Sequence, residues 1–580
     1  MNARTRCRRW FTSAVLPLAA RAASIGLATL LTHAAASAGQ QIPRDPAGPA
    51  VMVDPSPVYT VPSIIRPGYM APMIDPTFGT QVVRIAGNTG ASTAPISGTW
   101  GADTRHTYSK QQPWNSDGTL FMIDNRSGGS PSKLILNGTT FQPVIAPCSG
   151  DPRYDFRWHP SRAHPQEVIN VNSSGTELMW WNVVTCTKTR SWTLPITADY
   201  GIGSGEGNPS NDGRFVVVGN QTQMVVVDMD PQAPYAPYPN RRIGPVYSFG
   251  PCSLSAGCPI GNISVSASGK YVDVKYANAG DPNTADLHRI YEVDPATLAL
   301  RPHAMAGSSV RCTGFADRPN GYIFPLKHAD LGVNPYDANE DVIVGGRACP
   351  GSSIGHVVMV RLRDGLVTAL TDPSNEASVQ HVSTRNLDRP GWAYVGFYKV
   401  DGKRFSDEIV AVKMDGSRAV ERLAHKHAVT SGCYRCESHP VPSRDGRRVV
   451  FASNWAADCG AGCGPATDIK DYVVNTSSTV DVPAPPAPIA VASRIALEHV
   501  HPNPAVSFVT VGYALASAEP ATLELIDLAG RRVMRQDLPA PGAGHGEVIV
   551  HRGRGSGAGV YWLRLTQAGE SVSSRVVFMR

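Results

Sequence analysis

The phrase Ser210-Asn-Asp-Gly-Arg-Phe-Val-Val-Val218 decides the fold, because variants of it return three more times along the chain. The variants are Asn115-Ser-Asp-Gly-Thr-Leu-Phe-Met-Ile123, Ser266-Ala-Ser-Gly-Lys-Tyr-Val-Asp-Val274 and Ser443-Arg-Asp-Gly-Arg-Arg-Val-Val-Phe451. In each, Asp-Gly or Ser-Gly supplies a turn that tolerates positive φ, and the apolar run after it predicts a buried strand. The repeated unit is therefore a β-hairpin.

A second class of apolar run is typical of a partner strand. It includes Met224-Val-Val-Val-Asp-Met-Asp230, Ile290-Tyr-Glu-Val-Asp294 and Ile409-Val-Ala-Val-Lys-Met-Asp-Gly416. Helical periodicity is almost absent from the same region. Repeated hairpins at irregular intervals predict an all-β fold, a β-propeller over residues 59–476. Seven blades of about 60 residues would fill this region, and eight smaller blades are the alternative.

Other segments flank the predicted propeller. Residues 1–38 have an Arg-rich start, an Ala/Leu-rich stretch and a small-residue cleavage site, which indicates a signal peptide and export from the cell. Residues 39–58 would form a loose lead-in. Residues 477–492 form a Pro-rich linker of stiff, extended composition. Residues 493–580 alternate strands with Gly-containing turns, which favours a small immunoglobulin-like β-sandwich.

Charge and hydropathy give no sign of nucleic-acid binding or of a membrane-spanning segment in the mature chain. The chain has 53 Lys and Arg against 47 Asp and Glu, but five arginines and no acidic residue lie in the signal, so 48 basic residues face 47 acidic ones in the mature chain. This balance gives no indication of nucleic-acid binding. No apolar run outside the signal approaches the roughly 18 to 20 residues that span a bilayer, so no transmembrane segment is expected in the mature chain.

Ten cysteines remain once Cys7 of the signal is set aside, and an even number in an exported chain predicts disulfides between sequence neighbours. They are Cys148, Cys186, Cys252, Cys258, Cys312, Cys349, Cys433, Cys436, Cys459 and Cys463. The last four also have the C-x-x-C and C-x-x-x-C spacings of a zinc knuckle, which is the alternative.

Three phrases are too specific for generic repeats. They are Arg105-His-Thr-Tyr-Ser-Lys-Gln-Gln-Pro-Trp-Asn-Ser-Asp-Gly118, Gln380-His-Val-Ser-Thr-Arg-Asn-Leu-Asp-Arg-Pro-Gly-Trp-Ala-Tyr394 and Glu437-Ser-His-Pro-Val-Pro-Ser-Arg-Asp-Gly446. With shorter phrases near Asp75, Glu206 and His328, they resemble the propeller-fold polysaccharide lyases, notably ulvan lyases and more distantly oligogalacturonate lyases. The resemblance runs in order from about residue 66 to residue 455.

A lyase of this kind removes the proton α to a uronate carboxylate, so its site must neutralise that carboxylate, supply a base and protonate the leaving oxygen. The resemblance implies His106 as the proton-transfer histidine, and Tyr108 lies two residues on, hence on the same strand face. Tyr276 and Arg289 resemble the tyrosine and arginine that transfer the proton and neutralise the carboxylate. The alternative is that these are structural residues of the repeats.

Substrate binding is predicted at Arg105, Asn125, Arg126 and Glu206. The family carries a second active-site histidine about one hairpin after the first, whereas this chain has Asp124-Asn125-Arg126 there. Asn125 can hydrogen-bond a carboxylate but cannot neutralise it. Asp103, Glu206 and Asp330 are candidates for the rival chemistry, glycoside hydrolysis by carboxylate pairs, although acids beside Gly more often cap turns.

A divalent metal, zinc or calcium, is the predicted cofactor. His328, His381 and His439 fall in three separate family-like phrases, and imidazole suits zinc. The alternative is three structural histidines. His425 and His427, in Ala-His-Lys-His-Ala, are interpreted as a solvated turn.

The last segment also resembles the C-terminal sorting domains of type IX secretion substrates. It carries Pro-Asn-Pro at residues 502–504, Asp-x-x-Gly-Arg at 527–531 and Gly-Val-Tyr at 559–561, in the order of that family. The resemblance implies the secretion machinery as a partner and the cell surface or medium as destination. The whole sequence therefore predicts a secreted lyase of an acidic, uronate-containing polysaccharide, and the alternative is a non-catalytic propeller that binds glycan or protein at the surface.

Overall fold

The computed structural model describes residues 41–43, 50–148, 156–229, 243–249, 258–277, 287–304, 322–323, 326–347, 357–372, 374–475, 495–501, 503–505, 508–517, 519–538, 544–552 and 557–579. Within these ranges the chain is all-β, with no α-helix and two short 3-10 turns, Tyr434–Cys436 and Gly460–Gly462. None of the described segments is a helix long and apolar enough to cross a membrane. The predicted signal peptide and linker lie outside the described residues.

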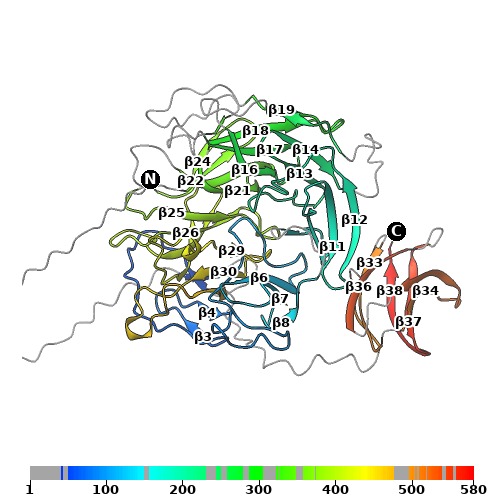
Figure 1. Cartoon of the computed structure of the whole chain (residues 1–580). Coiled ribbons are helices and arrows are strands. Elements are labelled where there is room, and N and C mark those ends of the chain that lie inside the picture. The colour runs from blue at the N-terminus through cyan, green and yellow to red at the C-terminus, as the bar shows by residue number, and fades with distance from the viewer. Residues whose placement is uncertain are drawn as a thin grey trace, which may run out of the picture.

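The described strands between residues 72 and 475 form a β-propeller of seven blades, which confirms the predicted fold (Figure 1). Blades 1 to 3 contain β5 (Asp103–Arg105), β6 (Leu120–Arg126), β7 (Lys133–Asn137) and β8 (Pro143–Ile145); β9 (Arg157–Trp158), β10 (Glu167–Val171), β11 (Glu177–Asn182) and β12 (Thr187–Thr193); and β13 (Phe215–Gly219), β14 (Gln223–Asp228) and β15 (Tyr247–Ser248).

Blades 4 to 6 follow in the same order around the ring. They contain β16 (Cys258–Val265), β17 (Tyr271–Ala277), β18 (Leu287–Val293), β19 (Leu300–Pro302) and β20 (Tyr322–Ile323); β21 (Leu326–Asn334), β22 (Glu340–Arg347), β23 (Val357–Arg361) and β24 (Val367–Ala369); and β25 (Val379–Ser383), β26 (Trp392–Phe397), β27 (Glu408–Lys413) and β28 (Val420–His425). We call the first strand of each blade, or the extended segment that leads into its second strand, the inner segment.

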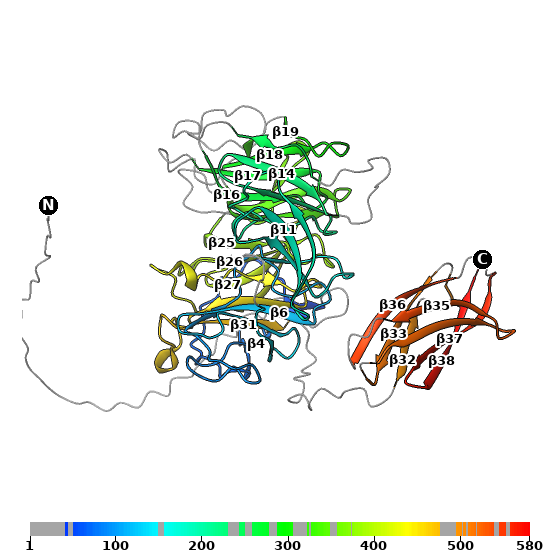
Figure 2. The same ribbon diagram turned by 45° about the vertical axis from the view of Figure 1, so that its right-hand side comes forward.

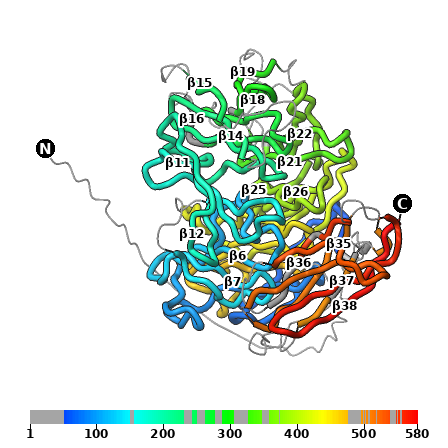
Figure 3. The backbone as a smooth tube through the Cα atoms, turned by 90° about the vertical axis from the view of Figure 1, so that its right-hand side faces the viewer, coloured from blue at the N-terminus to red at the C-terminus, as the bar shows by residue number. Residues whose placement is uncertain are grey.

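Blade 7 closes the ring with strands from both ends of the propeller. It contains β29 (Val441–Pro442), β30 (Arg448–Ser453), β31 (Ile469–Asn475), β4 (Gln81–Arg84) and β3 (Pro72–Ile74). β4 pairs antiparallel with β31, so that Val83 lies opposite Val473. The blue and yellow segments therefore lie side by side in the tube view (Figure 3). Backbone hydrogen bonds between the two ends leave the ring without an open edge there.

The recurrent turn joins an inner segment to the second strand of its blade. The four turn glycines, Gly118, Gly213, Gly269 and Gly446, have φ between 67° and 80°. These values lie in the left-handed region that glycine adopts without a steric penalty. The apolar runs that follow are β6, β13, β17 and β30, as the sequence predicts.

Apolar side chains fill the seven junctions between neighbouring blades in the described part of the chain. Between blades 2 and 3, for example, Ile169 and Leu178 pack with Val216 and Val225. The middle strands of a blade are thus covered on both faces. This burial explains why their sequences are continuous apolar runs rather than alternating ones.

The C-terminal segment is a β-sandwich of two antiparallel sheets, as predicted (Figure 2). One sheet contains β32 (Ala496–His501), β33 (Phe508–Leu515) and β36 (Gly544–His551), and the other contains β34 (Ala521–Asp527), β35 (Arg532–Leu538), β37 (Gly559–Gln567) and β38 (Glu570–Phe578). A core that includes Val509, Leu523 and Leu563 lies between them.

Strand pairing and disulfides decide two predictions, on the lead-in segment and on the cysteines. The lead-in is not wholly loose, because β2 (Ala50–Met52) pairs with β28 at Met52 and Arg422 and also with β1 (Gln41–Pro43). Three disulfides join sequence neighbours: Cys148–Cys186, Cys433–Cys436 and Cys459–Cys463. The last four cysteines therefore form bridges and not a zinc knuckle. The side chains of Cys252, Cys258, Cys312 and Cys349 lie outside what the structure describes.

Candidate functional site

Side chains from blades 5, 6 and 7 meet at the propeller axis. His328 on β21, His381 on β25 and Glu437 just before β29 each offer one ligand atom, and these atoms lie within 4.8 Å of one another. His381 Nε2 lies 2.6 Å from Glu437 Oε2. Two of the three predicted metal ligands are therefore adjacent, and a carboxylate that the sequence analysis quoted but did not assign completes the group.

His439, the third predicted ligand, stacks on His381 with ring centroids 3.7 Å apart and planes 22° apart. Both ring nitrogens of His439 and Nδ1 of His381 are buried, and within the described residues they have no hydrogen-bond partner. Buried polar atoms are nearly always hydrogen-bonded, so three such nitrogens in one place need an explanation. A bound ligand that accepts nitrogen lone pairs, such as a metal ion, fits them.

Burial keeps these imidazoles neutral. It lowers the pKa of His328 to about 3, and His381 and Lys275 add to the effect. It also holds the pKa of His381 and His439 well below their usual range, with Arg105 as the next cause in both. Neutral imidazole is the form that binds a metal, so this part of the site is ready without loss of a proton.

Backbone irregularities aim the histidines at the axis. His328 and His439 have φ of 48° and 44°, a region that residues other than glycine adopt at a cost of about 1–3 kcal/mol. The β21–β22 register shifts between Lys327 and Asp330, and the β25–β26 register shifts just before His381. Such bulges re-aim a side chain and are frequent next to functional sites. We refer to His328, His381, His439, Glu437 and Tyr108 as the histidine cluster.

Tyr108 brings a hydroxyl group from blade 1 into this cluster. Its oxygen lies 2.9 Å from His328 Nδ1, and its ring meets His381 and His439 edge-on, with centroids 5.3 and 4.9 Å away. Tyr434 lies beside the same rings with centroids 5.4 to 6.3 Å away, and it is 53% exposed. The cluster is thus reached from solvent past Tyr434, and neither contact could be read from sequence spacing.

A carboxylate and two lysines lie beside the cluster. Lys110 Nζ lies 2.5 Å from Glu206 Oε2, which joins blade 1 to the inner segment of blade 3. Burial alone would raise the pKa of Glu206, but Lys110 and Lys275 outweigh it and hold this pKa far below its usual range. Glu206 was predicted to bind substrate; Lys110 and Lys275 were not singled out, although Lys110 lies in the same phrase as Tyr108.

A turn closed by a disulfide positions Tyr434, Glu437 and His439. Cys433–Cys436 closes the turn that carries Tyr434 and precedes Glu437 and His439. Arg105 Nη1 donates to the carbonyl oxygens of Arg435 and Glu437 at 2.6 and 3.2 Å. Burial, and next Arg435, lowers the pKa of Arg105 to about 10. The fully buried Arg105 thus fixes the turn's backbone, while its predicted contact with substrate stays a prediction.

His106 lies beside the cluster with both ring nitrogens engaged. Nδ1 lies 2.8 Å from Asp471 Oδ1, and Nε2 lies 2.6 Å from the carbonyl oxygen of His439. The backbone N–H of His106 also donates to Asp471, at 2.5 Å. Since both ring partners are acceptors, the ring holds the backbone of His439 in place. Both ring nitrogens of His106 are thus engaged within the fold.

Asn125 and Arg126 occupy the place of the second family histidine. Asn125 Oδ1 accepts from Gly101 N and Thr104 Oγ1 at 2.7 and 3.1 Å, and its amide nitrogen donates to the carbonyl oxygens of Thr99 and Pro131 at 3.0 and 2.8 Å. Four hydrogen bonds use the whole amide for the local fold. Arg126 is partly exposed and pairs with Asp124 at 3.0 Å.

Tyr276 and Arg289 both lie beside Tyr291 in blade 4. The hydroxyl of Tyr276 is 2.9 Å from that of Tyr291, and the Arg289 guanidinium lies 5.4 Å from the centre of the Tyr291 ring. Tyr276 and Tyr291 belong to the apolar cluster between blades 3 and 4. These contacts do not join the pair to the histidine cluster, and their predicted catalytic roles stay predictions.

Two histidines and two carboxylates that the sequence singled out are buried in structural contacts. His425 and His427 are not in a solvated turn, because both are buried. His425 Nδ1 lies 3.2 Å from Asp75 Oδ2, and the ring of His427 lies against that of Trp455 with centroids 4.4 Å apart. Of the rival carboxylates, Asp103 pairs with Arg435 and Asp330 pairs with Arg385. Both are therefore neutralised by arginine within the fold.

The chain was compared with known proteins. No protein-family profile and no curated protein sequence matches it. Similar solved structures include Kuenenia stuttgartiensis hydrazine synthase (13% identity, TM-score 0.30, covering 57% of this chain and 88% of that one), U3-55K (10%, 0.33, 65% and 99%) and the Dos1 propeller (9%, 0.30, 66% and 96%). At these scores and identities the likenesses carry no argument about function, which must come from the site.

Proposed function

We propose that this protein is a secreted polysaccharide lyase that cleaves a uronate-containing acidic glycan by β-elimination at the histidine cluster. The observation that carries the proposal is the hydroxyl of Tyr108, 2.9 Å from His328 Nδ1, within a group of neutral imidazoles and beside Lys110. Proton transfer and carboxylate neutralisation are the two demands of this reaction, and both kinds of group meet here.

His328, His381 and Glu437 would hold a divalent cation, and His439 stacks on His381 beside them. Two imidazoles and a carboxylate are the donors of zinc sites, whereas calcium takes oxygen ligands only. When bound, zinc supplies a Lewis acid that neutralises the uronate carboxylate and so acidifies the α-proton.

The residues of the chain itself divide the remaining work. Tyr108 would take the proton from the α-carbon and return it to the leaving oxygen, since its hydroxyl lies 2.9 Å from His328 Nδ1, beside the residues that would hold the cation. Lys110 and Lys275 outnumber the carboxylate of Glu206 and so add positive charge beside the cluster. His106 positions the carbonyl of His439 through its hydrogen bonds. Tyr276 and Arg289 remain candidates for proton transfer and carboxylate binding through the family resemblance alone.

The proposal includes the location of the protein. The three disulfides support an oxidising compartment outside the cytoplasm, where such bonds persist. The β-sandwich, with the phrases of a type IX sorting domain, would direct the chain to the secretion machinery. Secretion of the full chain, and loss of secretion without residues 493–580, would test this part.

One observation favours the non-catalytic alternative. Both ring nitrogens of His106, the histidine that the resemblance implies for proton transfer, face acceptors within the fold. A cleft that keeps the lysines but lacks a working base would bind acidic glycan without cleaving it.

Ultraviolet absorbance separates the two functions, because elimination leaves a conjugated 4,5-unsaturated uronate. We expect absorbance to grow when the full chain is mixed with at least one polymer in a panel of uronate polysaccharides. It should fall at least 100-fold in Tyr108→Phe and stay unchanged in Tyr336→Phe, a half-exposed tyrosine of blade 5. A flat trace on every polymer, with measurable binding to one, would replace the lyase by the binding propeller.

A further inference from the structure

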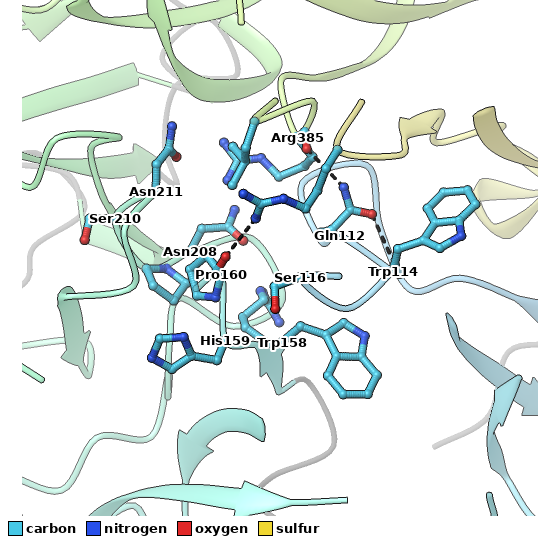
Figure 4. A pocket seen from close by; sticks show the side chains of 14 residues that line it. Gln112, Trp114, Ser116, Trp158, His159, Pro160, Asn208, Ser210, Asn211 and Arg385 are labelled. Atoms are coloured by element: carbon cyan, nitrogen blue, oxygen red, sulfur yellow. Dashed lines mark hydrogen bonds between the residues drawn. The ribbon is translucent and has the colours of Figure 1, made fainter. Parts of the chain in front are cut away.

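A second group of polar side chains meets at the axis, at the ends of the inner segments that lead into the recurrent turns. Five blades contribute to this pocket, which includes Gln112, Trp158, Asn208, Asn211, Arg385 and Arg444 (Figure 4). We call it the arginine pocket. It lies on the same segments as the histidine cluster, since Arg385 follows His381 by four residues and Arg444 follows His439 by five. Four residues of extended chain span about 13 Å, so the two are separate sites.

Arg385 supplies a charged donor that the fold leaves unused. Its side chain is 7% exposed, Nε donates to Asp330 at 3.0 Å, and Nη2 donates to the carbonyl oxygen of Leu331. Nη1 makes no hydrogen bond to any described residue and is not among the atoms sealed from solvent. Because the residue lines the pocket, this free N–H group is open to an acceptor there.

Arg444 and Arg162 give this end of the axis a surplus of positive charge. Both pair with the single carboxylate of Asp388, at 3.1 and 2.8 Å. Arg444 also donates to the carbonyl oxygen of Pro160 at 2.8 Å, which holds its guanidinium at the pocket. Two guanidinium groups on one carboxylate leave one positive charge uncompensated, and guanidinium binds carboxylate or sulfate oxygens well.

The asparagines supply the complementary groups. Asn208 donates its amide N–H to the carbonyl oxygen of Lys110 at 2.8 Å, but its Oδ1 accepts no hydrogen bond from the described residues. The carboxamide of Asn211 makes no side-chain hydrogen bond in the same part of the chain. A ligand for these groups must therefore carry hydroxyl donors as well as an oxyanion.

Two tryptophans line the pocket but leave little surface to a ligand. Trp114 and Trp158 donate their indole N–H groups to the carbonyl oxygens of Gly138 and Pro113, both at 2.9 Å. Their rings belong to the buried clusters between blades, and the ring of Trp114 points away from the pocket (Figure 4). The groups that face a ligand are therefore the arginines and asparagines.

We propose that the arginine pocket is a second binding site, for an acidic sugar unit whose oxyanion is a carboxylate or a sulfate ester. The oxyanion meets Arg385 Nη1 and Arg444, and the ring hydroxyls meet Asn208 Oδ1 and Asn211. This site extends the proposed function to a second contact with an acidic glycan, but it rests on the donors and acceptors of the pocket and not on cleavage at the histidine cluster.

Calorimetric titration of the full chain tests this site with D-galacturonate, galactose 6-sulfate, galactose and acetate. We expect at least one of the two acids to bind at least tenfold more tightly than galactose and than acetate. Asn211→Asp places a negative charge in the pocket without removing a hydrogen bond. It should weaken the binding of that acid at least tenfold. Asn375→Asp, the same change at an exposed turn of blade 6, should have no effect.

The outcomes distinguish this site from the histidine cluster. Loss of acid binding in Asn211→Asp and its retention in His381→Ala would support the proposal, whether or not the protein cleaves a polymer. Loss in His381→Ala alone would place the acid at the histidine cluster and overturn it. Equal binding of acetate or of galactose would also overturn it, since the pocket would then not recognise an acidic sugar. Circular dichroism of each variant confirms that the fold is retained.

Discussion

The two ends of the inner segments differ in charge although blades 1, 6 and 7 contribute to both. At one end burial removes the proton from His328, His381 and His439 and leaves neutral ligands. At the other end Arg385 and Arg444 stay charged and are held by Asp330 and Asp388. An imidazole can lose its proton at moderate cost, whereas a guanidinium cannot, so it must be paired. The comparison teaches that residue chemistry, and not position at the axis, decides what each end binds.

The largest expected effect separates the two ends by metal binding. His381→Ala removes the imidazole that lies against both Glu437 and His439, and should weaken zinc binding more than 100-fold. Arg385→Lys should leave zinc binding unchanged, because Arg385 has no atom in the histidine cluster. Competition with a chromophoric chelator measures both. An equal loss of zinc affinity in the two variants would show that the two ends are coupled, and the contrast between them would then be wrong.

Next in size is the charge pair beside the histidine cluster. Lys110→Met leaves the carboxylate of Glu206 largely buried with Lys275 as its remaining cation, and should lower the free energy of unfolding by about 2 kcal/mol. Lys110→Met with Glu206→Gln should recover most of this loss, because a neutral amide costs less to bury than a carboxylate that has lost its hydrogen-bonded cation. Urea unfolding of the single and double variants measures the difference. A double variant no more stable than the single one would contradict it.

The disulfide-closed turn offers a smaller effect, confined to one end. Replacing Cys433 and Cys436 by serine removes the constraint on the turn that carries Tyr434 and precedes Glu437. The affinity for zinc should fall about tenfold, a loss typical of residues that orient metal ligands. The same replacement at Cys459 and Cys463 is the matched control and should leave zinc affinity unchanged. A loss of equal size in the control would show general destabilisation instead.

A last prediction lies outside both ends of the inner segments and concerns a buried carboxyl group just before β25. Burial raises the pKa of Glu376 to about 8, against 4.5 in an unfolded chain, although its bond from Thr371 opposes the shift. A raised pKa means that stability is full below pH 4.5 and is lost as the pH rises to 8. Glu376→Gln should therefore lose less stability than the original chain between pH 5 and 8. Parallel pH slopes in thermal unfolding would contradict this.

Much of the fold could be predicted from sequence because its signals are local. A turn glycine followed by an apolar run specifies a hairpin within about ten residues, and Gly118, Gly213, Gly269 and Gly446 all adopt the expected left-handed backbone. Neighbouring cysteines are close in space for the same reason, and three predicted pairs are bonded. The closure of blade 7 by β4 has no local signal, since its partner β31 lies nearly 400 residues away.

The sequence by itself determined an all-β chain, a propeller built of repeated hairpins, a C-terminal sandwich, and His328 and His381 as neighbours at one site. Only the tertiary structure decided that Glu437 joins them and that both ring nitrogens of His106 contact groups of the fold. It also decided that Asn208, Arg385 and Arg444 meet in a pocket. The physical reason is that residue types and turns act over a few positions, whereas a hydrogen bond's partner is chosen by which blades the closed ring brings to its axis.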